Sequence, residues 1–348
     1  MFSVVKNSIT KKLVISFLII GILPLSILIK MSLNSFDKIA QNNLNKIRTT
    51  SESIADLIDR NLFERYGDVQ AFALNQAIQD KNTWYDQSEK SPLSKMMNSY
   101  VKTYAIYYLS LLVDTEGKLI CVNNIDEKGN PINSQSLYSK NYSETSWFKA
   151  LKNNEFTTST PFSKPENKNS TGTYIEDLHR DQEVMGTYPD SSGLTIGFSA
   201  PVYDAEGKVI AYWSNRAKYI IVEEIVMNTY QKLKEEGLKS TEITLLDGHG
   251  NVILDYDPMT KNSEKVSYDF ENVIFKLNLV KAGVEAALEA KEGKSGSMYA
   301  VHARKQIEQG CGYTHFSGAL GYPGMNWSVL VRIPKDESNE ITNKLRNS

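Results

Sequence analysis

The chain has 348 residues, and its 39 lysines and arginines nearly balance its 41 aspartates and glutamates, for a formal net charge of −2. This balance leaves no excess of basic residues for a nucleic-acid surface, so we expect no nucleic-acid partner. The two cysteines, Cys121 and Cys311, exclude a disulfide-rich scaffold. A hydrophobic core must therefore hold the fold, and 19 tyrosines, 12 phenylalanines and 4 tryptophans supply large side chains for it.

An uncharged apolar run occupies residues 13–29, between Lys12 and Lys30. A helix of this length reaches about 26 Å, and a lysine that extends toward the lipid headgroups completes a span of about 30 Å. We therefore expect a transmembrane anchor over residues 13–32. A cleaved signal peptide and a buried core helix are the alternatives, and the run has neither a small-residue cleavage site nor a polar face.

Basic residues precede the anchor, at Lys6, Lys11 and Lys12, with no acidic residue among them. Positive residues flanking a membrane helix stay on the cytoplasmic side, so residues 1–12 are expected in the cytoplasm. The remainder of the chain is then expected on the periplasmic or extracellular side of the cell inner membrane.

Apolar residues recur after the anchor at steps of mostly three, four or seven, which predicts one long amphipathic helix from residue 33 to 72. We expect a spine helix over residues 33–66 and a bend or a domain entry at Gly67. The apolar stripe must pack either on the chain's own domains or on a second copy. We expect it to be exposed over residues 33–62, which suggests a parallel homodimer through that helix. The stripe consists of Leu33, Phe36, Ala40, Leu44, Ile47, Ile54, Ile58, Leu62, Val69 and Phe72.

Three segments share the pattern of an apolar strand, a D-x-x-G turn and a second apolar strand. The turns lie at 114–117, 204–207 and 247–250. Aspartate begins such a turn by accepting hydrogen bonds from its own backbone, and glycine takes the left-handed position near its end. The repeated pattern predicts hairpins and hence antiparallel sheets.

Helical patterns follow at Tyr219 to Gly237 and over residues 268–290. With the hairpins they predict an α+β fold of two modules on the spine helix, over residues 67–225 and 226–335, followed by a polar helical tail over 336–348.

The sequence resembles the double-Cache extracellular sensors of bacterial methyl-accepting chemotaxis receptors and related histidine kinases. The resemblance spans the whole chain, through the apolar N-terminal run, the spine helix and four short segments. These segments are SWFKA at 146–150, SAPVYD at 199–204, GKVI at 207–210 and GYPGMNW at 321–327.

The resemblance implies two PAS-like modules on a long N-terminal helix, with the ligand in the membrane-distal module, 67–225. It implies the sensor region of a transmembrane chemoreceptor, signalling by helix displacement toward a second membrane helix beyond the tail. The alternatives within the family are the sensor region of a histidine kinase or of a diguanylate cyclase.

Amino-acid-binding members of the family place an arginine two residues before the tryptophan and an aspartate in the strand after the P-V-x-D hairpin. Here the two positions hold Thr145 and Arg216. An α-amino acid would lose its carboxylate fork and meet a cation near its ammonium, which is costly in a buried site. We therefore expect a small polar, planar or anionic metabolite rather than a simple amino acid.

The residues that match the family's pocket are aromatic or polar, with an arginine fork suited to a carboxylate. A role in the core is the alternative for both tryptophans, and an ion-paired strand residue is the alternative for Arg216. Residues 163–193 are polar and are expected to form an ordinary exposed loop or else a lid. The expected ligand-binding residues are Tyr138, Tyr142, Trp147, Phe148, Tyr188, Trp213, Asn215 and Arg216.

Other functions find little support in the sequence. It contains no G-x-S-x-G, H-E-x-x-H or P-loop pattern, so we expect no enzyme. It also lacks a pilin-type processing site, so we expect no pilin-like structural subunit. The run at 247–251 resembles the start of a calcium loop but has Pro258 where the closing glutamate belongs. The four histidines lack zinc-ligand spacing, so we expect no metal and no cofactor.

Overall fold

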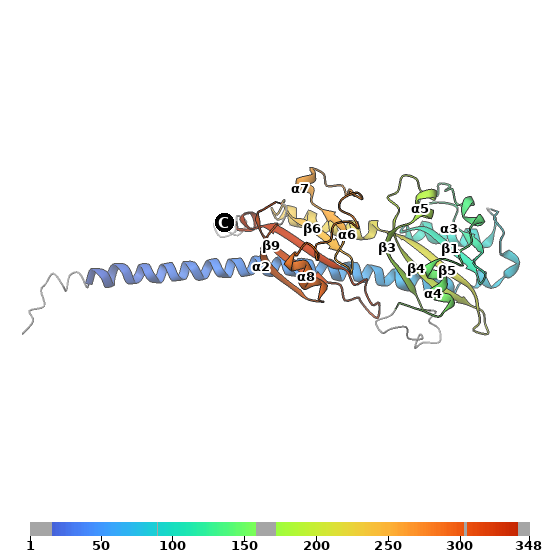
Figure 1. Ribbon diagram of the computed structural model, residues 1–348, viewed down its shortest axis with the longest axis horizontal. Coiled ribbons are helices and arrows are strands. Elements are labelled where there is room, and N and C mark those ends of the chain that lie inside the picture. Colours follow the sequence, from blue (N-terminus) through green and yellow to red (C-terminus); the bar gives the residue numbers. More distant parts are fainter. Residues whose placement is uncertain (1–15, 89, 158–171, 303–304, 340–348) are drawn as a thin grey trace, which may run out of the picture.

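The computed structural model describes residues 16–88, 90–157, 172–302 and 305–339. One long helix carries two modules side by side along its length (Figure 1). A short π-helical segment, η1 (Leu18–Ile22), leads into α2 (Leu23–Ala73). The predicted long helix is confirmed, but it continues past Gly67 to Ala73 without leaving the helical path.

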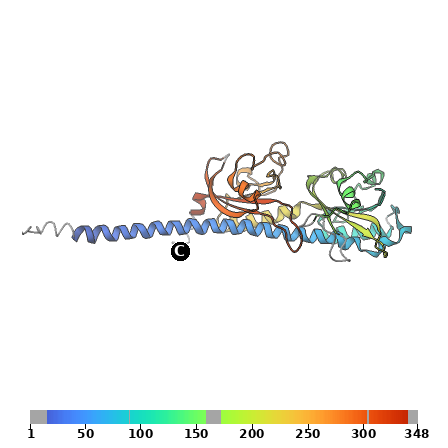
Figure 2. The same cartoon turned by 60° about the horizontal axis from the view of Figure 1, so that its bottom comes forward.

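The N-terminal part of this helix projects away from the modules (Figure 2). Residues 16–32 are exposed along their whole length. Among the described residues, no helix reaches the combination of length and apolarity needed to cross a membrane. Residues 1–15, which include the start of the expected anchor, lie outside the described part of the chain.

The first module is a five-stranded antiparallel sheet with the strand order β2-β1-β5-β4-β3. Its strands are β1 (Tyr107–Asp114), β2 (Leu119–Val122), β3 (Tyr174–Arg180), β4 (Leu194–Tyr203) and β5 (Val209–Lys218). Its helices are α3 (Pro92–Tyr104), α4 (Ser146–Lys152) and α5 (Gln182–Thr187), with short 3-10 turns η2 (Gln76–Gln79), η3 (Lys81–Thr83) and η4 (Gln135–Ser139).

The helix α6 (Ile220–Glu235), at the position predicted from the sequence, leads to a second five-stranded sheet. The order of that sheet is β7-β6-β10-β9-β8, so it repeats the topology of the first. Its strands are β6 (Glu242–Leu246), β7 (Val252–Tyr256), β8 (Ser295–Val301), β9 (Glu308–His315) and β10 (Ser328–Pro334), and its helices are α7 (Pro258–Lys261) and α8 (Glu285–Lys291).

All three predicted hairpins are present, as β1–β2, β4–β5 and β6–β7. In the turn of the third, the carboxylate of Asp247 accepts hydrogen bonds from the backbone N–H groups of His249 and Asn251, at 2.8 and 2.9 Å. Gly250 closes that turn with φ +85°. The aspartate of this run therefore serves a hairpin turn.

Two local predictions were wrong. Residues 268–284 are not helical, because their backbone pairs with β7: Phe275 N and Val252 N donate to Val252 O and Leu277 O, at 2.9 and 2.8 Å. In the segment expected as an exposed loop, residues 174–180 form the edge strand β3 and residues 182–187 form α5. Tertiary hydrogen bonds override the local sequence preference in both places.

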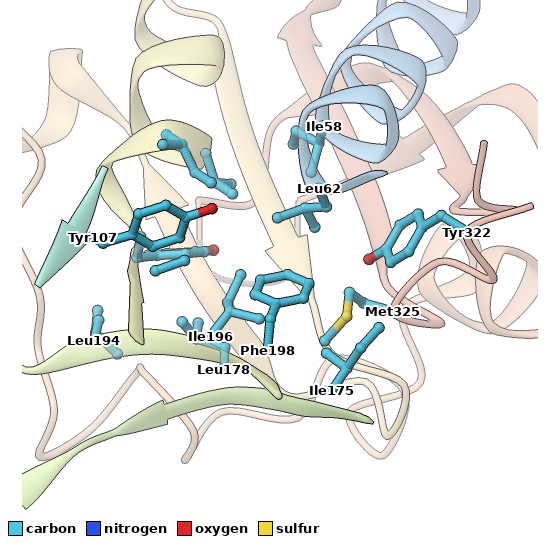
Figure 3. Close-up of a cluster of buried hydrophobic side chains, with 14 of the residues drawn as sticks. Ile58, Leu62, Tyr107, Ile175, Leu178, Leu194, Ile196, Phe198, Tyr322 and Met325 are labelled. Atoms are coloured by element: carbon cyan, nitrogen blue, oxygen red, sulfur yellow. The ribbon is translucent and has the colours of Figure 1, made fainter. Parts of the chain in front are cut away.

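The apolar stripe of α2 packs against both sheets, mainly through β4, β9 and β10. Figure 3 shows Ile58 and Leu62 of α2 in one buried cluster with Phe198 of the first module and Tyr322 of the second. The stripe is therefore not exposed from residue 47 onward, contrary to the prediction, because intramolecular packing covers it. Its buried members are Ile47, Ile54, Ile58, Leu62, Val69 and Phe72.

Candidate ligand-binding site

The central strand β5 presents alternate residues to opposite faces of the first sheet. Trp213 joins the core around α2, with its ring centroid 5.8 Å from that of Phe72. Tyr212 joins a second cluster, on the other face, where its ring lies 4.9 Å from that of Phe148 of α4. Arg216 is four residues from Tyr212 on the same strand, so its side chain lies on the same face, away from α2.

Arg216 is buried between acidic side chains. Its Nε donates to Oδ2 of Asp181 at 2.9 Å, and its Nη1 lies 3.4 Å from Oε2 of Glu176. Nη1 also donates to the hydroxyl of Ser214 at 2.6 Å. A Cβ on Gly197 would lie 2.8 Å from Oε2 of Glu176, so glycine in β4 leaves the room that this ion pair occupies.

The acidic partners have further contacts. Asp181 caps α5 by accepting from the backbone N–H of Glu183 and Val184, and its Oδ2 lies 3.6 Å from Nε2 of His179. Burial alone would raise the pKa of Asp181, but the hydrogen bond with His179 and the charge of Arg216 hold it well below its usual range. Asp181 therefore remains a carboxylate at neutral pH.

A third carboxylate, Glu183, lies in the same cluster. Its charge acts on Arg216, after the nearer charges of Glu176 and Asp181. Burial and then the charge of Glu183 raise the pKa of Tyr142 above its usual range. Three acidic groups thus surround one arginine. Oε1 of Glu183 is also ion-paired with Nζ of Lys140 at 3.2 Å, which leaves its Oε2 as the oxygen without a cation.

Some buried polar atoms of this cluster make no hydrogen bond to the described residues. They are Nε1 of Trp147, the hydroxyl oxygen of Tyr142 and Oε2 of Glu183. An unpaired polar atom in a protein interior costs free energy unless a ligand or water pairs with it. The guanidinium carbon of Arg216 lies 5.7 Å from the ring centroid of Trp147, so indole, guanidinium and carboxylates share one space.

The structure brings most of the predicted residues to this face. Trp147 lies 6.0 Å from both Tyr142 and Phe148, measured between ring centroids. Tyr138 and Tyr188 pack partly buried against the same apolar cluster, and the hydroxyl of Tyr188 donates to the carbonyl oxygen of Tyr108 at 2.8 Å.

Trp213 and Asn215 lie on the opposite face and do not meet Arg216 there. The indole N–H of Trp213 donates to Oδ1 of Asn215 at 2.7 Å, and that oxygen also accepts from the hydroxyl of Ser110 at 2.8 Å. Both side chains are fully buried, and the ring of Trp213 contacts Phe72 of α2 and Tyr100 of α3. This placement corresponds to the core alternative for Trp213.

The acidic residues Glu176, Asp181 and Glu183 are absent from the sequence-based prediction. They lie on β3 and α5, within the segment expected as a loop. A usable signal was present, because Asp181 begins a short stretch with an acidic residue two positions later, which is typical of a helix start. Among the described residues, no group of three or more His, Cys, Asp or Glu side chains has metal-site geometry.

The sequence matches no family model and no curated protein. Several solved structures share the fold. A domain of a sensory box/GGDEF family protein from Vibrio parahaemolyticus has a TM-score of 0.56 at 12% identity, covering 86% of this chain and 99% of its own. The extracellular domain of a histidine kinase has a TM-score of 0.57 at 10% identity, with coverages of 87% and 95%.

The ligand-binding domain of a Pseudomonas fluorescens chemoreceptor, in complex with L-isoleucine, has a TM-score of 0.51 at 13% identity, with coverages of 88% and 98%. These structures are sensory or ligand-binding domains. The chain therefore has the double-Cache fold of such sensory domains, with two PAS-like modules on one long helix. This confirms the fold expected from the resemblance.

Proposed function

We propose that the chain is the extracytoplasmic sensor region of a transmembrane receptor and binds a small polar metabolite in the membrane-distal module. The carrying observation is the buried cluster around Arg216, in which three carboxylates and an indole surround one guanidinium. The solved ligand complex of similar fold, with L-isoleucine, supports a small molecule as the partner.

A buried acceptor without a partner in the cluster favours a ligand with an amine. Arg216 is already paired with Asp181 and Glu176, so an anionic ligand would have to displace a carboxylate from it. The unpaired Oε2 of Glu183 suits an ammonium donor, and Trp147 offers an aromatic face beside it. We therefore refine the expected anionic or planar metabolite to a cationic or zwitterionic one.

A matched three-carbon series tests this choice in the full chain by thermal shift: propylamine, β-alanine and propanoate, followed by a wider set of amines. A ligand that binds only the native state raises stability by about 2.7 kcal/mol at one hundred times Kd. We expect amines or zwitterions to stabilise the protein and Glu176→Gln to weaken the effect. Stabilisation by anions alone, lost in Arg216→Gln, would contradict the proposed ligand class.

We propose that the N-terminal helix attaches the sensor to the inner membrane. Its large apolar side chains between Phe17 and Met31 are exposed, with Phe17 at 77% and Ile20 at 74% exposure. Detergent-dependent extraction of the full chain from a membrane fraction tests this, against a variant carrying Ile20→Lys and Ile27→Lys. Recovery of the unaltered chain in the aqueous fraction would contradict attachment.

The dimer remains a proposal for the part of α2 that precedes Ile47, where the chain's own sheets do not bury the helix. Sedimentation in detergent should give twice the chain mass. A monomer at every concentration, with and without ligand, would contradict it.

Chemoreceptor output is proposed first, with histidine kinase and cyclase outputs as alternatives supported by the other similar structures.

We propose that the ligand acts by displacing α2, which packs on both modules. Shifts of one or two ångströms between packed helices are a common form of signal transmission. No catalytic role is proposed for the chain, because the similar structures named above are sensory or ligand-binding domains.

A further inference from the structure

The second module contains a cavity of about 430 Å³ on the face of its sheet away from α2. On β10, Val329 and Val331 pack toward α2, whereas Leu330 joins the cluster under α8. Arg332 is two residues from Leu330, so its side chain lies on the same face as that of Leu330. The backbone over 277–286 closes the cavity from the other side. Its apolar wall includes Val252, Leu277, Leu279, Val284 and Ala300.

Part of the lining of this cavity is polar. Arg332, Thr244 and Gln309 line it, and all three are buried. Arg332 donates from Nη2 to the hydroxyl of Thr244. Its Nε, and Nε2 of Gln309, are buried without a hydrogen-bond acceptor among the described residues. Two unpaired donors facing an apolar space call for an acceptor oxygen from outside the chain.

Arg332 is less fully paired than Arg216. The nearest carboxylate oxygen, Oε2 of Glu242, lies 3.6 Å from its Nη2 and is shared with His302 at 3.3 Å. The other oxygen of Glu242 binds Lys305. Arg216, in contrast, holds a carboxylate at 2.9 Å. The guanidinium of Arg332 therefore has donors left for an anionic group.

The two arginines occupy equivalent places. β10 and β5 are the central strands of sheets with the same topology, and each arginine lies two residues before the end of its strand. Of the two, only Arg216 donates a hydrogen bond to a carboxylate, that of Asp181.

Acidic residues at the cavity limit the charge of a ligand. Asp255 and Glu285 also line it, and a second negative charge on the ligand would be repelled by them. The apolar wall favours a short hydrocarbon body.

We propose that the cavity of the membrane-proximal module binds a small aliphatic monocarboxylate, with its carboxylate on Arg332 and its hydrocarbon against the apolar wall. This site is separate from the cluster around Arg216, and it does not rest on the ligand proposed for the distal module.

Calorimetric titration of the full chain in detergent tests the proposal, with the straight-chain acids from acetate to hexanoate as probes. We expect affinity to rise with chain length until the cavity is filled. Butanamide and succinate should bind at least about tenfold more weakly than butanoate, because one lacks the charge and the other adds a second.

Variants locate the binding. Arg332→Gln should weaken butanoate binding at least about tenfold, whereas Arg216→Gln is the matched control and should leave it unchanged. Ala300→Phe fills the cavity without altering a charge and should also abolish binding. It provides a second test of the site if Arg332→Gln does not fold. No binding by any acid of the series, or binding lost only in Arg216→Gln, would overturn the proposal.

Discussion

Trp327 of the second module donates a hydrogen bond from its indole Nε1 to Oδ1 of Asp177 in the first module, at 2.8 Å. Asp177 lies on β3, next to Glu176, which is ion-paired with Arg216. Adjacent residues on a strand point to opposite faces. The edge strand β3 therefore connects the proposed ligand cluster to the joint between the modules.

Trp327→Phe should weaken the coupling between the modules. The change removes one partly buried hydrogen bond, which costs about 1 kcal/mol of folding free energy. It should also lower the ligand-induced protection of the second module in hydrogen exchange. Trp213→Phe is the matched control, because its indole also donates one hydrogen bond to a side chain, but to one within its own module. Equal exchange behaviour of the two variants would contradict a coupling role for this contact.

The ion pairs of Arg216 should be important for stability. Arg216→Gln leaves Asp181 and Glu176 buried without their cation, and breaking a buried pair from one side costs about 3 kcal/mol. Urea unfolding measures the loss. Arg180→Gln, at an exposed arginine of the same region, should change stability by less than about 1 kcal/mol. A cost for Arg216→Gln no larger than this control would show that the pairing contributes little.

Asp59 on α2 should make the protein less stable as the pH rises. Burial raises its pKa to about 6, despite a hydrogen bond from the backbone N–H of Gly318 at 2.8 Å. Because the folded-state pKa lies above the unfolded value, the protonated form stabilises the fold at low pH. This contribution is fully present below about pH 4 and is lost as the pH rises through about 6.

Asp59→Asn keeps the acceptor and removes the charge, so it should add about 1 to 2 kcal/mol of stability at pH 7.5 and much less at pH 4.5. Unfolding by urea at the two pH values gives the comparison. Glu206→Gln, at an exposed acidic residue of the first module, is the control. A gain that does not depend on pH would contradict the assigned titration.

Glycine in β9 sets the distance between α2 and the second sheet. A Cβ on Gly312 would lie 2.4 Å from the backbone carbonyl oxygen of Ile47, which cannot move without shifting the helix. Gly312→Ala should therefore destabilise the protein by about 2 kcal/mol. Gly67→Ala meets no atom within 4 Å and should stabilise α2 by up to about 1 kcal/mol. Thermal unfolding that shifts the same way for both variants would contradict this packing.

Much of the fold follows from local patterns. The stripe from Ile47 to Phe72 has the helical period, and each D-x-x-G turn fixes its own hairpin through side-chain and backbone hydrogen bonds. The segment 268–284 was misassigned because its structure depends on pairing with β7, and a helical spacing of apolar residues carries no information about that partner.

The candidate site was predictable only in part. The resemblance led to Arg216 and Trp147, but strand alternation puts Trp213 and Asn215 on the other face, and the sequence does not say which face α2 covers. The acidic partners of Arg216 come from β3 and α5, which reach it through the pairing of β3 with β4. Such long-range pairing leaves no local periodic signal.

The most direct test of the ligand cluster is the affinity of a stabilising amine, measured by calorimetry on the full chain and on Glu183→Gln, with Arg332→Gln as control. Glu183→Gln removes one charge and keeps an oxygen acceptor, so we expect affinity to fall at least about tenfold, with no change in the control. Unchanged affinity in Glu183→Gln, or a loss confined to Arg332→Gln, would place amine binding outside the cluster around Arg216 and contradict the proposed site.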